Sequence, residues 1–393
     1  GTVDAANKDA LVKQLREQGL MTSKVQEKKA QGIAKKKTGK RLFGGRVNLR
    51  HLSIFCRQFA TMINAGVSLV RCLDVLEQQT DSARLKEIIR EIEAEVEGGA
   101  TLSRSMARFP RVFSNLAVGL VRAGEVGGVL DETLDRLAGF LEKDLELRRK
   151  VKSSMTYPVL VMIVAVGIVT FLVTFILPKF MKMFVELGMT EDKFPLPTLV
   201  LMKISNFATS KWYIVVAIVV GLTIAYNRIK ATKTGKRYVD MLKLRFPVFG
   251  SLNHKIAISR FARTLSTLLS SGVPILSAME TVAGTVDNDI IADAIFLSRA
   301  AIREGDTIAD PLAHSKLFPP MVVQMITIGE ETGQLDQMLE KVADFYESEV
   351  EAALESLTSA LEPVLIVFLG VVVGFIVVSM FLPLVAIIGE LSQ

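Results

Sequence analysis

Two long segments of this chain contain no charged residue. Val159–Leu177 and Val364–Leu382 each comprise 19 uncharged and mostly apolar residues. At a rise of 1.5 Å per residue, a helix of this length spans about 29 Å, close to the roughly 30 Å hydrocarbon thickness of a bilayer. Both segments therefore predict transmembrane helices, which excludes a soluble globule of ordinary composition.

A third, weaker segment lies between these two. Trp212–Tyr226 is an apolar run of 15 residues and is too short to cross a bilayer alone. It becomes long enough if its helix begins near Thr198 and Lys211 extends its side chain toward the headgroups. We therefore predict a second transmembrane helix here, which makes three spans in total.

Lysine and arginine flank the predicted spans unevenly, which predicts their orientation. Dense clusters precede the first span (Lys143, Arg148, Arg149, Lys150, Lys152) and follow the second (Arg228, Lys230, Lys233, Lys236, Arg237). By the positive-inside rule both clusters belong in the cytoplasm. The approach to the third span carries glutamates instead, so its orientation follows only from the number of spans, which places the C-terminus on the far side.

The chain also repeats itself at an offset of 206 residues that becomes 205 after about residue 108. Matched pairs include Arg57 with Arg263, Gly66 with Gly272, Gly99 with Gly305, Phe113 with Phe318, Glu125 with Glu330, and Pro158 with Pro363. A sustained match of this kind indicates a duplicated domain with its following span. The middle helix then returns the second copy to the same side of the membrane.

Each copy reads as six α-helices without strand alternation. Apolar spacings of three and four predict the helices, and glycines and polar caps predict their ends. The predicted boundaries are a stop at Gly66, starts at Ser68 and near Pro274, a helix over 81–97 that stops at Gly98 and Gly99, caps at Thr101 and Ser114, and a last helix from Val129 to Tyr157. This last helix is predicted to continue into the bilayer, where a rigid helix can transmit a displacement.

The composition argues against catalysis, metal binding and cofactor binding. Cys56 and Cys72 cannot build a disulfide framework or a thiolate zinc site, and the three histidines are scattered. No phosphate-binding loop, zinc-protease or serine-hydrolase motif occurs in the sequence. We therefore expect a non-enzyme without catalytic, metal-binding or cofactor-binding residues, and we interpret both cysteines as buried apolar residues.

A basic stretch precedes the first copy. Residues 24–50 contain ten Lys or Arg residues and one acidic residue, Glu27, with glycines interspersed. This pattern favours a flexible, solvated linker, with attraction to anionic lipid headgroups as the alternative. Nucleic acid is disfavoured as a partner because Phe43 is almost the only base-stacking side chain available.

The most distinctive motif is A-G-E-V-G-G, which contains Gly124, Glu125 and Gly128. Its counterpart is I-G-E-E-T-G, which contains the residues Gly329, Glu330 and Gly333. One interpretation is a tight turn in which glycines end the fifth helix and the glutamate bonds backbone N–H groups at the start of the sixth. The alternative is a partner-contact surface formed by exposed glutamates.

Small residues within the membrane segments predict helix packing. Gly370 and Gly374 form a G-x-x-x-G motif, and Gly221 lies in a similar stripe. Such faces allow helix backbones to approach closely, and we favour packing within the chain over dimerisation. The first and third spans contain no ionisable residue, which argues against a transporter.

These motifs carry a resemblance to a known family. Four features carry it: the string F-x-R-Q-x-A-T-M-I-N-A-G-V-S-L at Phe55–Leu69, the A-G-E-x-G-G turn, Tyr157-Pro158 at the start of the first span, and Pro178 at its end. In these features the chain resembles the inner-membrane platform proteins of type II secretion and type IV pilus machines. The likeness covers about residues 1–390 and is nearer to the pilus branch. The second copy departs from it at Glu362 and Ile328.

The resemblance implies a non-enzymatic scaffold in the bacterial inner membrane, with its N-terminus cytoplasmic and its C-terminus periplasmic. Its partners would be a cytoplasmic hexameric assembly ATPase, pilin or pseudopilin subunits, other inner-membrane assembly proteins, and further copies of itself in a homodimer or higher oligomer. It would couple the ATPase to pilin insertion. The alternatives are the equivalent platform of a type II secretion system and, more remotely, a membrane transporter.

The expected fold is therefore an all-α polytopic membrane protein with two homologous cytoplasmic six-helix bundles and three transmembrane helices. The expected segments are 1–50, an N-terminal segment and basic linker; 51–157, the first bundle; 158–178, transmembrane helix 1; 179–211, a periplasmic loop and the start of helix 2; 212–227, transmembrane helix 2; 228–361, the second bundle; 362–383, transmembrane helix 3; and 384–393, a periplasmic C-terminus.

Overall fold

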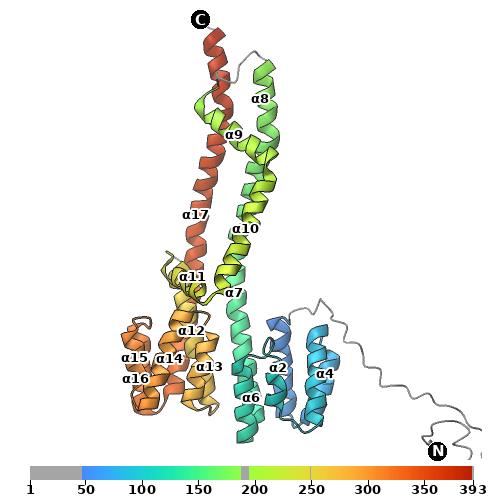
Figure 1. Ribbon diagram of the computed structural model, residues 1–393, viewed down its shortest axis with the longest axis vertical. Helices are drawn as coiled ribbons and strands as arrows, with labels where there is room; N and C mark the ends of the chain where they lie inside the picture. Colours follow the sequence, from blue (N-terminus) through green and yellow to red (C-terminus); the bar gives the residue numbers. More distant parts are fainter. Residues whose placement is uncertain (1–46, 187–193, 248, 392–393) are drawn as a thin grey trace, which may run out of the picture. The chain divides into compact units, whose positions relative to one another are not determined.

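The computed structural model describes residues 47–186, 194–247 and 249–391. The predicted N-terminal segment and basic linker lie almost wholly outside these residues, as does part of the predicted loop after the first span. Every regular element in the described ranges is a helix, which confirms the all-α fold class (Figure 1).

The helices of the first copy pack around buried apolar side chains that form one continuous cluster with those of the second copy. Its elements are α2 (Leu49–Asn64), α3 (Leu69–Gln79), α4 (Ala83–Glu97), α5 (Leu102–Ala107), α6 (Asn115–Gly127) and the N-terminal part of α7 (Leu130–Phe171). The predicted caps are confirmed, because the Thr101 hydroxyl accepts from Arg104 N at 3.3 Å and the Ser114 hydroxyl accepts from Ala117 N at 3.3 Å.

The second copy repeats this order. Its elements are α12 (Phe249–Ser270), α13 (Ile275–Thr285), α14 (Asp289–Glu304), α15 (Ala309–His314), α16 (Pro320–Thr332) and the N-terminal part of α17 (Leu335–Leu391), with α11 (Lys233–Arg245) before them. A matching aromatic pair lies in each copy: the Phe55 and Phe113 ring centroids are 6.4 Å apart, and those of Phe261 and Phe318 are 5.0 Å apart. The duplication in sequence is thus a duplication of packing.

Three helices in each copy end at corresponding glycines with positive φ. The stop after α2 is Gly66 with φ +80°, and the stop after α12 is Gly272 with φ +74°. Residues with a Cβ rarely adopt this left-handed conformation, whereas glycine adopts it without steric cost. The helix boundaries predicted from glycine positions are therefore confirmed.

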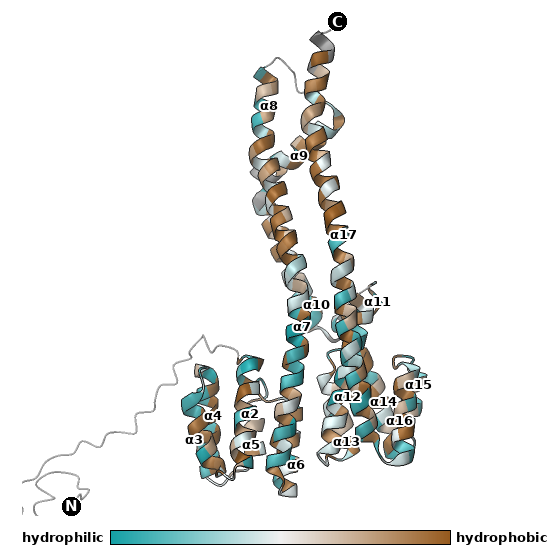
Figure 2. Ribbon diagram, turned by 180° about the vertical axis from the view of Figure 1, so that it is seen from behind, coloured by the Kyte–Doolittle hydropathy of each residue, from teal (hydrophilic) through white to brown (hydrophobic). Residues whose placement is uncertain are grey.

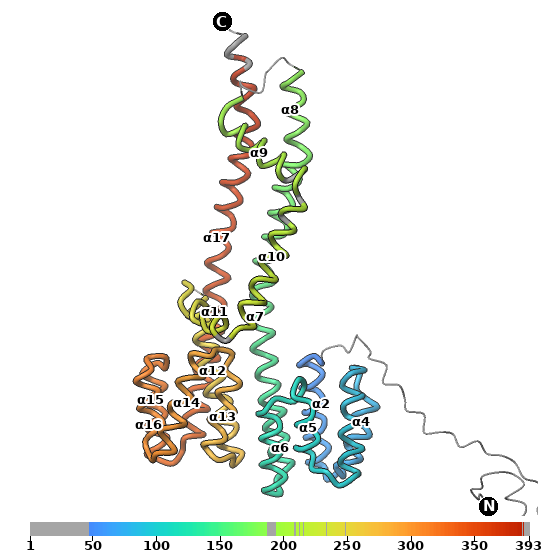
Figure 3. Tube along the Cα trace, in the orientation of Figure 1, coloured from blue at the N-terminus to red at the C-terminus, as the bar shows by residue number. Residues whose placement is uncertain are grey.

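The last helix of each copy continues without a break into an apolar segment. The helical path of α7 passes through a π-helical turn, η1 (Leu172–Ile176), into α8 (Leu177–Glu186), as the tube in Figure 3 follows. The path of α17 is one helix of 57 residues. Figure 2 shows both helices changing from hydrophilic residues in their N-terminal parts to hydrophobic residues beyond.

These two helices are long and apolar enough to cross a membrane, in the stretches Leu130–Glu186 and Leu335–Ala386. Of the most apolar 18-residue stretch in each helix, only 11% and 22%, respectively, is buried within the chain. A core helix of a soluble protein buries most of such a surface, so these exposed apolar stretches favour lipid as their surroundings.

The segment predicted as the second span consists of two helices. The expected continuous helix from Thr198 is wrong: α9 (Leu196–Ser210) ends at Lys211, where φ is −125° and ψ is 26°, and α10 (Trp212–Ala231) begins after it. The 20 residues of α10 contain the predicted apolar run. Membrane crossing by α10 stays a prediction.

Candidate functional site

The A-G-E-V-G-G turn brings α6 and α7 into close contact. A Cβ atom added to Gly124 would lie 2.0 Å from Thr133 Oγ1 and 3.0 Å from Leu130 Cα, both in α7. Gly128 ends α6 with φ +71°. In the second copy, a Cβ on Gly329 would lie 2.8 Å from Leu335 Cα, and Gly333 has φ +69°. The predicted tight turn is thus present in both copies.

The two glutamates of these turns cap a different helix from the one expected. Glu125 accepts from Leu102 N at 2.5 Å and Ser103 N at 3.2 Å, at the start of α5. Glu330 accepts from Ile308 N at 2.6 Å and Ala309 N at 3.2 Å, at the start of α15. The expectation that they bond the start of the sixth helix is wrong, because α7 starts beyond the glycines while α5 and α15 present unpaired N–H groups to each carboxylate.

These bonds leave the glutamate carboxylates engaged within the fold. Both side chains are partly buried, and each carboxylate uses both oxygens on backbone donors of the adjacent short helix. A negative charge at a helix start is also favoured by the helix dipole. The structure therefore supports the turn interpretation, and partner contact at Glu125 or Glu330 stays a prediction.

We expect Glu330→Ala to lower the free energy of unfolding by about 2 kcal/mol, because the backbone N–H groups of Ile308 and Ala309 lose their charged acceptor. Thermal unfolding of the full chain in detergent, followed by circular dichroism, measures the effect. Glu331→Ala is the matched control, since Glu331 is exposed and its loss should change stability by less than about 0.5 kcal/mol. Equal unfolding temperatures for the two variants would contradict the capping role.

A second repeated feature ties the first helix of each copy to its long helix. Arg57 donates from Nε and Nη2 to Glu142 at 2.7 Å each, and from Nη1 to Asp135 at 2.5 Å. In the second copy, Arg263 donates to Glu347 at 2.9 Å and to Asp344 at 2.5 Å. We call these two groups of residues the arginine clamps.

The arginine clamps shift the pKa values of their members. In the first clamp, the hydrogen bonds between Arg57 and Glu142 raise the pKa of the Arg57 guanidinium and lower the pKa of the Glu142 carboxyl. Burial acts to lower the pKa of Arg263, but the hydrogen bonds to Glu347 and Asp344 outweigh it, so the pKa is raised. These shifts favour the charged forms of Arg57, Glu142 and Arg263, whose bonds join α2 to α7 and α12 to α17.

The two long helices contact one another where they leave the bundles. Lys150 Nζ of α7 donates to Glu351 Oε2 of α17 at 2.9 Å, and Thr358 Oγ1 donates to Ser154 O at 3.5 Å. An apolar cluster lies beside these bonds: its buried members are Leu252, Val350, Leu354 and Leu357, and Leu147, Val151 and Met155 of α7 pack against it. Direct polar and apolar contacts therefore join the two long helices at this level.

Two hydrogen bonds tie α9 to the long helices within the apolar region. Ser205 Oγ donates to Val173 O at 2.6 Å, at the π-helical turn, and Thr198 Oγ1 donates to Ser379 O of α17 at 2.6 Å. The Ser205 hydroxyl therefore bonds a backbone carbonyl of the π-helical turn. In an apolar medium such bonds hold helices together.

The membrane glycines do not make the expected contacts within the chain. A Cβ on Gly221, Gly370 or Gly374 would meet nothing within 4 Å. Instead, α17 packs against the rest of the chain through Ile376, which is 2% exposed. This residue follows Gly374 by two positions, about 200° around the helix, so the glycine face points away from α9. The preferred intramolecular packing is therefore wrong for the described residues, and contact between copies stays a prediction.

The described residues offer no group of three or more His, Cys, Asp or Glu side chains that could hold a metal ion. Both cysteines are buried, and burial raises the pKa of the Cys56 thiol to about 12, which keeps it protonated and unreactive near neutral pH.

Comparison with known proteins places these features in a family. The family model for type II secretion system (T2SS), protein F matches residues 55–178 and again 261–383, which are the two structural copies with their apolar helices. Type IV pilus assembly protein PilC of Thermus thermophilus is 45% identical over 392 residues, covering 100% of this chain and 95% of that protein.

Two further relatives extend the comparison. Type IV pilus assembly protein PilC of Myxococcus xanthus is 45% identical over 350 residues, covering 89% of this chain and 83% of that protein. Type II secretion system protein F of Vibrio cholerae is 31% identical over 394 residues, covering 100% and 96%. The higher identities are with the pilus proteins. The chain therefore belongs to the type II secretion system protein F family, on the side of its type IV pilus members.

Proposed function

We propose that this protein is the inner-membrane platform of a type IV pilus assembly machine. In this function it couples a cytoplasmic hexameric ATPase to the insertion of pilin subunits into the growing filament, and it catalyses no reaction itself. The 45% identity with two proteins named type IV pilus assembly protein PilC supports the choice of system.

The observation that carries the coupling mechanism is the continuity of each bundle with an apolar helix. The arginine clamps hold α2 to α7 and α12 to α17, so a push on a bundle acts on its long helix. The Lys150–Glu351 ion pair joins the two long helices. On this proposal, the ATPase moves the bundles in the cytoplasm, and α7 and α17 carry the displacement to pilins in the membrane.

Copurification and genetics test this function. A tagged full chain, solubilised in mild detergent, is expected to copurify with the assembly ATPase of its own host, and deletion of its gene should abolish pili. The purified protein alone should hydrolyse no ATP. Normal pili in the deletion strain would overturn the proposal, and so would nucleotide hydrolysis by the chain alone.

A type II secretion platform is the second candidate, favoured by the family description and by the relative from Vibrio cholerae. The same deletion strain separates the two functions. Loss of a secretion platform would leave pili intact and would block the export of folded proteins. The remote transporter alternative requires ion-dependent flux into liposomes that contain the purified chain alone.

A further inference from the structure

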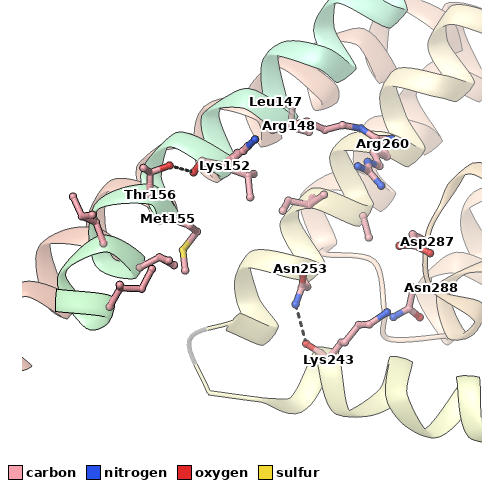
Figure 4. Close-up of a pocket in the computed structure, with 16 residues that line it drawn as sticks. Leu147, Arg148, Lys152, Met155, Thr156, Lys243, Asn253, Arg260, Asp287 and Asn288 are labelled. Atoms are coloured by element: carbon pink, nitrogen blue, oxygen red, sulfur yellow. Dashed lines mark hydrogen bonds between the residues drawn. The ribbon is translucent and has the colours of Figure 1, made fainter. Parts of the chain in front are cut away.

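A cavity of about 750 Å³ lies between α7 and α12, at the level where α7 changes from charged to apolar residues. Figure 4 shows Arg148, Lys152 and Met155 of α7 opposite Arg260 and Asn253 of α12. The two helices belong to different copies of the repeat. Whatever fills the cavity therefore contacts both halves of the protein. Its volume is in the range of sites for ligands of several tens of atoms.

The part of the cavity nearer the bundles is positively charged. Four cationic side chains line it, against one carboxylate, Asp287; the cations are Arg148, Lys152, Lys243 and Arg260. Lys243 pairs with Asp240 at 2.7 Å. Arg148 and Arg260 share one acid, Asp144, at 2.9 and 3.6 Å. The paired acids therefore leave a positive excess.

Two of these cations have unused hydrogen-bonding capacity. Arg260 Nε is buried and has no hydrogen-bond partner among the described residues. Lys152 is exposed and forms no ion pair within the ranges that the structure describes. A buried guanidinium N–H without an acceptor costs free energy, so the cavity favours an anionic oxygen ligand beside Arg260.

The part of the cavity beside the uncharged segment of α7 is apolar. Its α7 wall continues with Val159, Leu160 and Ile163, which are 52%, 58% and 64% exposed. These residues begin the uncharged segment Val159–Leu177. Tyr157, which is 49% exposed, lies between the cations and this wall, and tyrosine is typical of the membrane interface. With Val159–Leu177 spanning the bilayer as predicted, the cations would lie at headgroup depth and the apolar wall at acyl-chain depth.

We propose that the cavity binds one anionic phospholipid, with its phosphate held by Arg260 and Lys152 and its acyl chains against Val159, Leu160 and Ile163. A soluble anion would use only the cations, and a zwitterionic lipid would add a cationic group beside four others. The lipid would complete the contact between α7 and α12 and so stiffen the junction between the two bundles at the membrane surface.

Native mass spectrometry of the full chain, released from nanodiscs of phosphatidylcholine with phosphatidylglycerol, tests this proposal. We expect about one phosphatidylglycerol retained per chain and little phosphatidylcholine. Lys152→Gln and Arg260→Gln should each weaken retention about fivefold, the effect of one cation at an anionic surface. Arg149→Gln is the matched control: Arg149 is an exposed neighbour at the same depth that does not line the cavity, and its retention should equal that of wild type.

Two further arms separate the lipid from other occupants. Leu160→Ser should weaken retention of phosphatidylglycerol, because the acyl chains lose an apolar contact, and excess inorganic phosphate should not displace the lipid. Equal retention in the Lys152, Arg260 and Arg149 variants would overturn the proposal. Displacement by inorganic phosphate, or a copurified peptide in place of lipid, would overturn it as well.

Discussion

A flexible Gly-Ser insertion after Lys152 is expected to reduce piliation to the level of the deletion strain while both helical bundles stay folded. Lys152 lies within α7, between the last arginine-clamp residue, Glu142, and the apolar segment from Val159. A flexible segment there absorbs a displacement of the first bundle before it reaches the membrane. Electron microscopy of pili, with circular dichroism of the purified variant, measures both outcomes.

Two controls separate stiffness from disruption. The same insertion between Gly305 and Asp306, two exposed residues at the end of α14, should leave piliation intact. A helical insertion of seven residues after Lys152 turns the helix by about 700°, within about 20° of two full turns, and keeps it rigid. It should preserve more piliation than the flexible insertion. Equal loss in both Lys152 variants would contradict the transmission of force by α7.

The second large effect is expected at the glycines where α6 meets α7 and α16 meets α17. Gly329→Ala places a methyl group 2.8 Å from Leu335 Cα, and Gly124→Ala places one 3.0 Å from Leu130 Cα. Backbone atoms cannot rotate away, so the helices must separate and the carboxylate caps shift with them. We expect each variant to lower the free energy of unfolding by about 2–3 kcal/mol.

Two glycines inside helices, one in each copy, provide the controls. Gly119 of α6 and Gly284 of α13 have nothing within 4 Å of an added Cβ and lack positive φ. Alanine at these positions should be neutral or stabilising by up to about 1 kcal/mol, because alanine is the better helix former. Thermal unfolding of all four variants in one detergent compares them. Similar unfolding temperatures throughout would contradict the close approach.

The sequence predicted the helices well where a boundary depends on local chemistry. Gly66, Thr101 and Ser114 end or start helices where expected, because positive φ and side-chain capping depend on a few neighbouring residues. The repeat was visible because residues such as Gly66 and Thr101 recur at a constant offset, as Gly272 and Thr307. The all-α class followed from these signals together.

The sequence did not reveal which distant groups meet. Glu125 was assigned to the start of α7, whereas it caps α5, 22 and 23 residues earlier. A signal was present: Thr101 and Thr307 precede the short helices in both copies, just as Glu125 and Glu330 recur. The arginine clamps were missed for the same reason, since their partners lie 78 to 85 residues away and many acids on the long helices are equivalent by spacing alone.

The membrane region shows a different limit. G-x-x-x-G motifs predict that a helix face can pack closely, but they do not say against what. In this chain the opposite face of α17 is the one that packs: Ile376 is buried there, and the Thr198 hydroxyl of α9 donates to Ser379 O. The break at Lys211 was likewise missed, because neither proline nor glycine marks it.

We propose that the two repeated bundles lie on the same side of the membrane, each at the base of its own continuous helix. Single cysteines at Ala94 and Ala300, exposed residues 206 positions apart, test it directly in a chain whose buried Cys56 and Cys72 are replaced by alanine. A membrane-impermeant maleimide should label both positions in inverted inner-membrane vesicles and neither in right-side-out vesicles. Labelling of one position from each side would contradict the account.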